Sequence, residues 1–110
     1  MNFNCAGFVV IKKSGKVAVV ASRKGNYSLP KGKIEHGETT LVAARRELKE
    51  ETGIILDDSE LLIGIEYSEY SAKNHPNIIY YYAIIPENKF NSLKAEDPEE
   101  LSEAKWIDRK

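Results

Sequence analysis

The stretch from Gly32 to Ile54 decides the fold and has the sequence GKIEHGETTLVAARRELKEETGI. Its second half, from about Thr39 to Thr52, predicts an α-helix, because apolar residues recur on one helical face at Leu41, Ala44 and Leu48. Thr39 or Thr40 can cap the N-terminus of this helix. Gly53 stands where a helix is expected to stop. One amphipathic helix is therefore expected here.

Three glutamates of this helix form a cluster of negative charge. Because residues three and four apart are neighbours on a helix, Glu47, Glu50 and Glu51 place their carboxylates on one side within a single turn. Arg46 offsets only part of the repulsion, since a guanidinium reaches one or two carboxylates at a time. A hard divalent cation compensates more fully, and carboxylate oxygens with retained waters suit Mg²⁺. Glu38 is placed to extend this acidic site from beside the helix N-terminus.

The segment before the helix supplies the opposite sign. Residues 22–38 are rich in glycine and polar side chains, which predicts a long ordered loop without long regular structure. Its cations are interleaved with Gly25 and Gly32, so that side chains and backbone amides together suit phosphate oxygens. They are Arg23, Lys24, Lys31 and Lys33. We expect a metal ion that bridges the glutamates and a polyphosphate, with the loop neutralising the remaining charge.

The remaining chain is dominated by strand patterns. Two β-branched runs around Gly15 predict a first hairpin, and two later runs predict a second hairpin that turns at about Ser71–Asn77. The strands are expected at Phe8–Ile11, Val17–Ala21, Ile54–Leu56, Leu61–Tyr67, Ile78–Ile85 and Ala104–Ile107, with a short helical turn at Asp97–Leu101. A mixed α/β fold follows.

Length and composition predict one soluble domain. The 110 residues suffice for a single core, and 16 Lys and Arg against 17 Asp and Glu provide no general basic field for nucleic acid or a membrane. The single Cys5 cannot form an internal disulfide, and no Cys/His spacing indicates zinc. Residues 1–10 show no signal or membrane segment. A cytoplasmic location is expected.

The motif itself identifies a family resemblance. Gly32, Glu38 and the run from Arg46 to Ile54 are similar, at every fixed position, to the Nudix box, G-x5-E-x7-R-E-U-x-E-E-x-G-U, in which U is a bulky aliphatic residue. The resemblance covers nearly the whole chain, including the closing run at residues 100–107. It implies a single Nudix hydrolase domain over residues 1–110, an α/β/α sandwich with a mixed sheet and one catalytic glutamate-rich helix.

The resemblance also implies roles for individual residues. Glu50 and Glu51 correspond to metal ligands, Glu47 to a ligand or the base that activates water, and Arg46 to the residue that orients a neighbouring glutamate. The backbone carbonyl of Lys31 corresponds to a further metal ligand, Gly32 allows the tight loop, and Glu38 belongs to the outer shell of the metal. In the late acidic stretch, Glu100 corresponds to another ligand or base, with Glu99 as its rival.

The implied reaction is hydrolysis of a nucleoside diphosphate linked to another group, with Mg²⁺ or alternatively Mn²⁺. The segment Leu29–Gly32 resembles the form found in dinucleoside polyphosphate hydrolases, so diadenosine tetraphosphate is the favoured substrate. Similar forms occur in mRNA-decapping members, so capped RNA is an alternative that the near-neutral charge disfavours. A MutT-like (d)NTP pyrophosphohydrolase is a further alternative, and a noncatalytic nucleotide-binding module is a more remote one.

Aromatic residues provide the second hint about the substrate. Tyr80 and Tyr82 must share one face of their strand and Tyr81 the other. The strand is similar to one that lies near the bound adenine in dinucleoside tetraphosphate hydrolases, and stacking on a base is worth about 1–3 kcal/mol. Sheet packing is the alternative role. His36 and His75 are expected to be exposed, and Trp106 to anchor the core.

One departure from the family pattern concerns the end of the sequence. The sequence stops at Lys110, directly after the last predicted strand, whereas relatives generally continue into a further helix that covers the sheet. We therefore expect this C-terminal helix to be absent. An uncovered apolar sheet face tends to find a partner, which predicts a homodimer.

Overall fold

The computed structural model describes every residue except 1–2, 23, 69–76, 97–100 and 109–110, and only the backbone of 62–68 and 101–102. One α-helix, α1 (Thr40–Thr52), and one short 3₁₀ helix (Asp58–Glu60) lie in this part of the chain. The strands are β1 (Cys5–Lys12), β2 (Lys16–Ser22), β3 (Tyr27–Ser28), β4 (Lys31–Lys33), β5 (Leu61–Ser68), β6 (Ile78–Ile85) and β7 (Leu101–Asp108). None of the described helices is long and apolar enough to cross a membrane.

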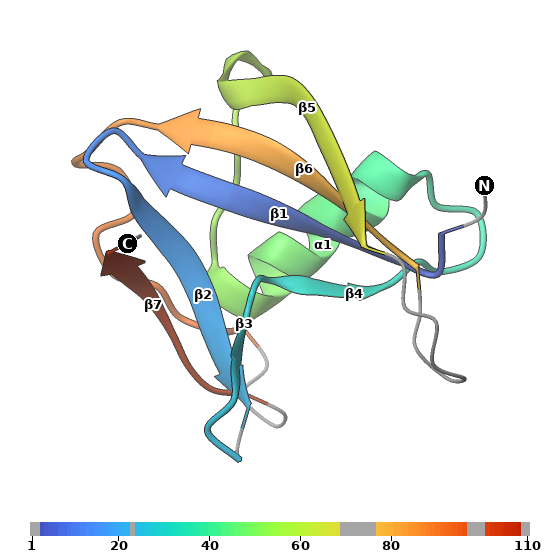
Figure 1. The fold of residues 1–110 in the computed structure, drawn as a ribbon, viewed down its shortest axis with the longest axis horizontal. Helices are drawn as coiled ribbons and strands as arrows, with labels where there is room; N and C mark the ends of the chain where they lie inside the picture. Colours follow the sequence, from blue (N-terminus) through green and yellow to red (C-terminus); the bar gives the residue numbers. More distant parts are fainter. Residues whose placement is uncertain (1–2, 23, 69–76, 97–100, 109–110) are drawn as a thin grey trace.

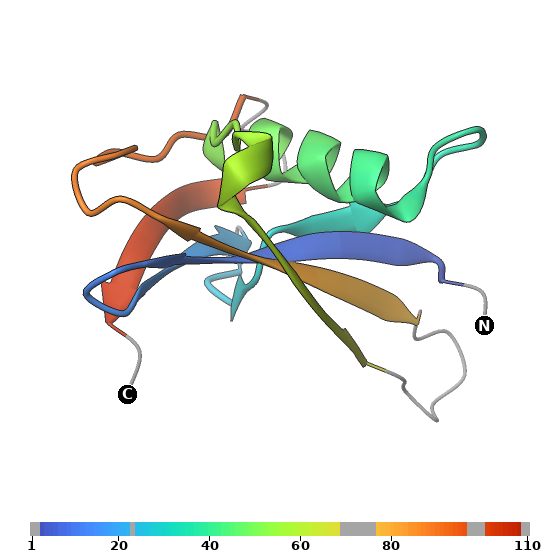
Figure 2. The same cartoon turned by 90° about the horizontal axis from the view of Figure 1, so that it is seen from above.

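The strands form one mixed sheet (Figure 1). The order is β3-β2-β1-β6-β5, while β4 pairs with β1 and β7 pairs with β2. The pairing of β1 with β6 is parallel, and the other described pairings are antiparallel. Helix α1 lies against one face of this sheet (Figure 2). The predicted mixed sheet and single glutamate-rich helix are confirmed.

The core lies between α1 and the sheet. Alternate residues of β1 and β6 face the helix, because side chains of a strand alternate between the two faces. Phe8 and Val10 from β1 meet Ala44 and Leu48 from α1, and all four are buried in one cluster. Leu41 packs against this cluster, as does Trp106. The predicted apolar helix face and the predicted core role of Trp106 are therefore confirmed.

The turn and cap residues act as the sequence predicts. Gly15 has a φ of 100° at the turn of the first hairpin, a conformation that favours glycine. The side-chain oxygen of Thr39 accepts a hydrogen bond from the amide of Val42, so Thr39 and not Thr40 caps α1. At the other end, Gly53 has a φ of 81° and donates its N–H to the carbonyl of Lys49.

Some element predictions are wrong. Ile54–Leu56 is not a strand, because it pairs with no strand in the described part of the chain and follows α1 as irregular chain. Ile54 and Leu56 are buried in the core, which explains their apolar character. The loop at 22–38 also contains two short strands, β3 and β4, that pair with β2 and β1. Pairing with an existing sheet edge is tertiary information that local sequence does not carry.

The other strand predictions are confirmed, and the last strand is longer than expected. Strands β5 and β6 pair antiparallel as the second hairpin requires. Most of its expected turn, at Ser71–Asn77, and most of the helical turn expected at Asp97–Leu101 lie outside the described residues.

Gly7 is a glycine in the middle of β1 that lets two chain segments meet. A Cβ atom at Gly7 would lie 2.3 Å from the carbonyl oxygen of Pro30 and 2.7 Å from Cβ of Lys31. The amide of Phe8 donates a 3.1 Å hydrogen bond to the same carbonyl. Glycine inside a strand often marks such a close approach. Because Gly7 has no side chain, the segment before α1 can pack directly against β1.

Replacing Gly7 by Ala is expected to lower the free energy of unfolding by about 1–3 kcal/mol, because the new methyl group meets backbone that cannot turn aside. Urea unfolding of Gly7→Ala measures this loss. Gly32→Ala is the matched control and should lose less, because its new methyl group meets only the end of the Glu47 side chain. Parental stability in Gly7→Ala would contradict the close approach.

Candidate active site

The Arg46 side chain is the hub of the acidic cluster. Its guanidinium donates hydrogen bonds of 2.7 and 3.0 Å to Glu38, 3.1 Å to Glu47 and 3.3 Å to Glu50. It also donates to the carbonyl of Lys33 at 2.9 Å. The expectation that it reaches only one or two carboxylates is wrong. Glu38 approaches from the loop while the other two come from α1, so the planar group meets partners on several sides.

This arrangement favours the charged forms of Glu38 and Arg46. The hydrogen bonds from Arg46 are the main reason that the pKa of the Glu38 carboxyl lies below its usual value. In turn, the bond to Glu38, followed by the neighbouring Glu47, raises the pKa of the Arg46 guanidinium. One permanent cation thus ties the loop before α1 to two glutamates of the helix.

A second pair of carboxylates, Glu47 and Glu51, lies one turn apart beside β4. The backbone N–H of Lys31 donates to Glu51 at 3.2 Å. Burial raises the pKa of Glu51 to about 8, helped by its hydrogen bond to Glu47 and by the charge of Glu47. The Glu51 carboxyl therefore holds a proton near neutral pH unless a cation lies beside it.

Gly32 makes room for this pair. A Cβ atom at Gly32 would lie 2.1 Å from the carboxyl carbon of Glu47. The sequence predicted a tight loop at this glycine, and the structure gives a more specific reason: the Glu47 carboxylate occupies the space where a side chain would stand.

The chemistry of these groups fits a hard divalent cation. Apart from Arg46, the side chains of this cluster offer carboxylate oxygens as metal ligands, and a cation between Glu47 and Glu51 would replace the proton of Glu51. Among the described residues no three or more His, Cys, Asp or Glu side chains are already arranged to hold an ion. Glu50 instead contacts Arg46. Metal binding by Lys31, Glu47, Glu50 and Glu51 therefore stays a prediction.

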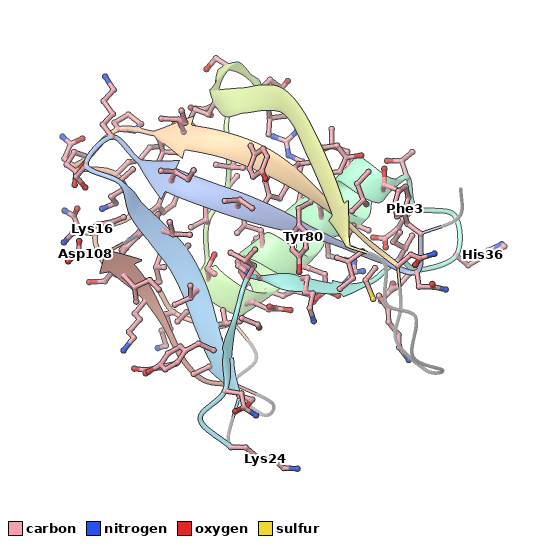
Figure 3. The ribbon with its side chains drawn as sticks, viewed as in Figure 1. Phe3, Lys16, Lys24, His36, Tyr80 and Asp108 are labelled. Carbon is pink, nitrogen blue, oxygen red and sulfur yellow. The ribbon has the colours of Figure 1, made fainter. Side chains whose placement is uncertain are left out.

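The other predicted site residues are dispersed. Lys24 lies at an exposed tip of the chain (Figure 3), whereas Lys33 joins the site through its backbone carbonyl. His36 is exposed, as expected. Arg23, His75, Glu99 and Glu100 lie outside the described residues. The segment that leads to the last two is anchored on α1, since the amide of Glu96 donates to the carbonyl of Glu50 at 2.7 Å.

The tyrosines of β6 alternate as predicted. The Tyr81 hydroxyl is hydrogen-bonded to Thr40, and its ring packs against Phe8 with centroids 5.9 Å apart, so Tyr81 faces α1. Tyr80 and Tyr82 consequently lie on the opposite face (Figure 3 labels Tyr80). The contact between Tyr81 and Thr40 was not predicted, because no sequence pattern relates two residues so far apart.

One row of paired residues crosses strands β4, β1 and β6. Gly7 is in register with Tyr80 on one side and with Lys31 on the other. The positions of their Cβ atoms place Lys31 on the same face as Gly7, and therefore as Tyr80, while Gly32 faces Glu47. Two strand spacings separate Tyr80 and Lys31, which is about 10 Å. Sequence reasoning missed Gly7, although a lone glycine inside a strand pattern was its signal.

This fold and site define a class of proteins, and comparison with known families identifies it. The family description "NUDIX domain" matches residues 1–110. The chain belongs to the NUDIX family of hydrolases, so the resemblance of its motif is confirmed.

Individual relatives differ in what they act on. The chain is 32% identical to the RNA pyrophosphohydrolase of Pelagibacter ubique, covering 96% of this chain and 75% of the relative. A C. elegans Ap4A hydrolase binary complex superposes with a TM-score of 0.75 and 25% identity, covering 97% of this chain and 80% of that one. A bifunctional NMN adenylyltransferase/ADP ribose pyrophosphatase of Francisella tularensis, with AMP and a manganese ion, gives 0.70 and 25%, covering 100% and 35%.

The chain corresponds to only part of several relatives. It spans 41% of the RNA pyrophosphohydrolase of Erythrobacter litoralis and 38% of Nudix hydrolase 7 of Arabidopsis thaliana. These matches support the family and the fold, whereas the substrate requires separate evidence.

Gly32→Ala should separate stability from activity. The new methyl group forces the flexible Glu47 side chain away, so we expect thermal unfolding to change little while any Mg²⁺-dependent hydrolysis falls by about a hundredfold or more. Gly7→Ala, whose new methyl group meets backbone, should instead show a larger loss of stability. Full activity in Gly32→Ala would refute the assigned position of Glu47.

Glu51 should make the metal-free protein less stable as the pH rises. Its pKa of about 8 lies above its ordinary value of 4.5, so between these values the folded state binds a proton that the unfolded state does not. The stabilisation is complete below about pH 4.5 and is lost as the pH rises through about 8. Thermal unfolding in EDTA at several pH values measures this loss.

Two controls accompany that measurement. Glu51→Gln should remove this part of the pH dependence, since the amide does not titrate. Mg²⁺ should raise the melting temperature more at pH 8.5 than at pH 5.5, because metal binding competes with the proton. An unchanged pH dependence in Glu51→Gln would exclude Glu51 as its source.

Proposed function

We propose that this protein is a Mg²⁺-dependent pyrophosphohydrolase that cuts a diphosphate linkage in a nucleoside diphosphate linked to another group. The observation that carries the proposal is the Glu47–Glu51 pair packed on the backbone of Lys31 and Gly32. Membership in the NUDIX family supports the same class of reaction.

The proposed roles combine the contacts of the described residues with the resemblance of the motif. A bound divalent cation would lower the pKa of a water molecule and neutralise phosphate charge. Glu47 and Glu51 are the groups best placed to hold it beside β4, with the Lys31 carbonyl and Glu50 as further ligands. Glu47 or Glu100 accepts the proton of the attacking water. Arg46 fixes Glu47 and Glu50 by hydrogen bonds and is a positioning residue.

A dinucleoside polyphosphate such as diadenosine tetraphosphate is the proposed substrate. The segment Leu29–Gly32 and the similarity to the C. elegans Ap4A hydrolase both favour it. The shared face of Lys31 and Tyr80 adds a structural reason, because a cation and an aromatic ring about 10 Å apart suit a phosphate chain and a base. In this proposal Arg23, Lys24 and Lys33 bind phosphate, and Tyr82 contributes to the same face as Tyr80.

RNA with a 5′ phosphate chain is the second candidate. The observation in its favour is the similarity to the Pelagibacter ubique protein, which is named RNA pyrophosphohydrolase. The net charge of -1 provides little general attraction for an RNA chain. Capped RNA and (d)NTPs are the remaining substrates to compare. A noncatalytic binding module is disfavoured, since it has no need to retain closely packed carboxylates.

Assembly and location stay predictions. The sheet face opposite α1 carries Ile84 and Ile107, which are 44% and 39% exposed. Exposed apolar residues on one face are compatible with the proposed homodimer. A cytoplasmic location remains an expectation from the sequence.

A substrate panel tests the proposal. The protein with Mg²⁺ or Mn²⁺ is incubated with diadenosine tetraphosphate, RNA with a 5′ triphosphate, capped RNA, nucleoside triphosphates and ADP-ribose, and the products are separated by chromatography. We expect the fastest turnover with diadenosine tetraphosphate. Failure to cleave every substrate with either metal would sink the enzymatic assignment, whereas faster cleavage of RNA would favour the second candidate. Glu50→Gln should reduce turnover at least about a hundredfold, while Asp58→Asn, at a side chain 91% exposed in a surface ion pair, should not.

A further inference from the structure

A pocket lies apart from the acidic cluster around Arg46. It has a volume of about 520 Å³ and is lined by residues of β1, β2 and β7 and of the segment after β6. The lining residues that matter here are Lys12, Lys16, Glu87, Asn91, Ser92 and Trp106. A pocket of this size suits a small molecule.

Lys12 is a buried cation in the wall of this pocket. The residue is only 5% exposed. Its Nζ atom lies 3.4 Å from Oδ1 of Asn91 and 4.7 Å from the centre of the Trp106 ring. No carboxylate in the described part of the chain forms an ion pair with it. The ring is itself fixed, since the Trp106 indole N–H donates to the carbonyl of Phe90 at 2.7 Å.

These partners leave the charge of Lys12 incompletely compensated. Lysine is rarely buried unless it is paired, because removing an ammonium group from water is costly. A neutral amide oxygen and an aromatic face offset part of that cost. An ammonium group has three N–H donors, of which Asn91 accepts one through a long bond. Lys12 therefore retains donors and positive charge for an anion.

The acidic residue of the pocket is already engaged. The two carboxylate oxygens of Glu87 accept hydrogen bonds of 2.8 Å from the amide and the hydroxyl of Ser14. These bonds hold Glu87 against the turn between β1 and β2, where its charge attracts Lys12 and Lys16 without forming an ion pair with either. Lys16 adds a second cation to the lining.

We propose that this pocket binds the phosphate group of a small phosphorylated molecule, with Lys12 as its principal contact. A compact ammonium group is a common phosphate ligand. The side-chain amide of Asn91 and the hydroxyl of Ser92 provide neutral donors in the same lining. The volume exceeds what a phosphate group alone needs, which favours a phosphate ester.

The pocket is separate from the proposed active site. Lys31 pairs with Gly7 in the middle of the sheet, and Lys12 lies five residues further along β1. At roughly 3.3 Å per residue this separation is about 16 Å. Figure 3 shows Lys16 at the end of the sheet away from His36 and the loop before α1. Binding here is independent of whether the proposed hydrolysis is correct.

The single tryptophan provides the readout. We would titrate the protein in EDTA with inorganic phosphate and with AMP at constant ionic strength, and follow Trp106 fluorescence and the NMR signal of its indole N–H. A saturable change is expected with both probes, and tighter binding of AMP would identify an ester as the ligand. Lys12→Met, which retains the length and packing of the side chain, should weaken binding by about tenfold or more. Lys13→Met, at an exposed neighbour, should not.

A second variant keeps the test decisive if Lys12→Met folds poorly. Asn91→Asp places a carboxylate 3.4 Å from the retained lysine and should remove phosphate binding by internal competition. Glu47→Gln should bind both probes as the parent does. No saturable response to either probe, parental affinity in Lys12→Met or Asn91→Asp, or loss of binding in Glu47→Gln would each overturn the proposal.

Discussion

The repulsion between carboxylates on a single turn of α1 is the constraint that shapes the site. Glu47, Glu50 and Glu51 would push one another apart in an isolated helix. Arg46 binds two of them and, through Glu38, joins the helix to its preceding loop. Glu51 is held instead by burial and by the amide of Lys31. Arg46 therefore compensates only part of the negative charge. The remaining negative charge of the Glu47–Glu51 pair is what a metal ion could neutralise.

The sheet brings this pair close to residues that we propose to bind the substrate. Strand β4 is short, yet its successive residues serve opposite faces, because strand side chains alternate. Gly32 makes room for Glu47 on the helical side, whereas Lys31 shares the other side with Tyr80. Gly7 allows this arrangement by letting the backbone of Pro30 approach β1. Two glycines thus position one acidic and one basic surface around the same short strand.

The charge at the Lys12 pocket has the opposite sign from that of the acidic cluster. The acidic cluster has like charges that need a cation, whereas the pocket has a buried cation whose direct contacts are the neutral Asn91 amide and the Trp106 ring. In both places the protein's own groups balance the local charge only in part. Such places are candidate ligand-binding sites. Their separation along β1 lets one small domain carry two such sites.

The sequence by itself determined the helix, its caps, its apolar face and the glutamate spacing, because these depend on residues within a few positions of one another. It also indicated the family through one local motif, which the match over residues 1–110 confirmed. The tertiary structure alone decided that Ile54–Leu56 is irregular chain with Ile54 and Leu56 buried, that β3 and β4 join the sheet, and that Arg46 hydrogen-bonds to three carboxylates. It also decided that Tyr81 meets Thr40 and that Lys12 is buried beside Trp106. These contacts join residues distant in the chain, and only the packing of α1 and the pairing of strands bring them together.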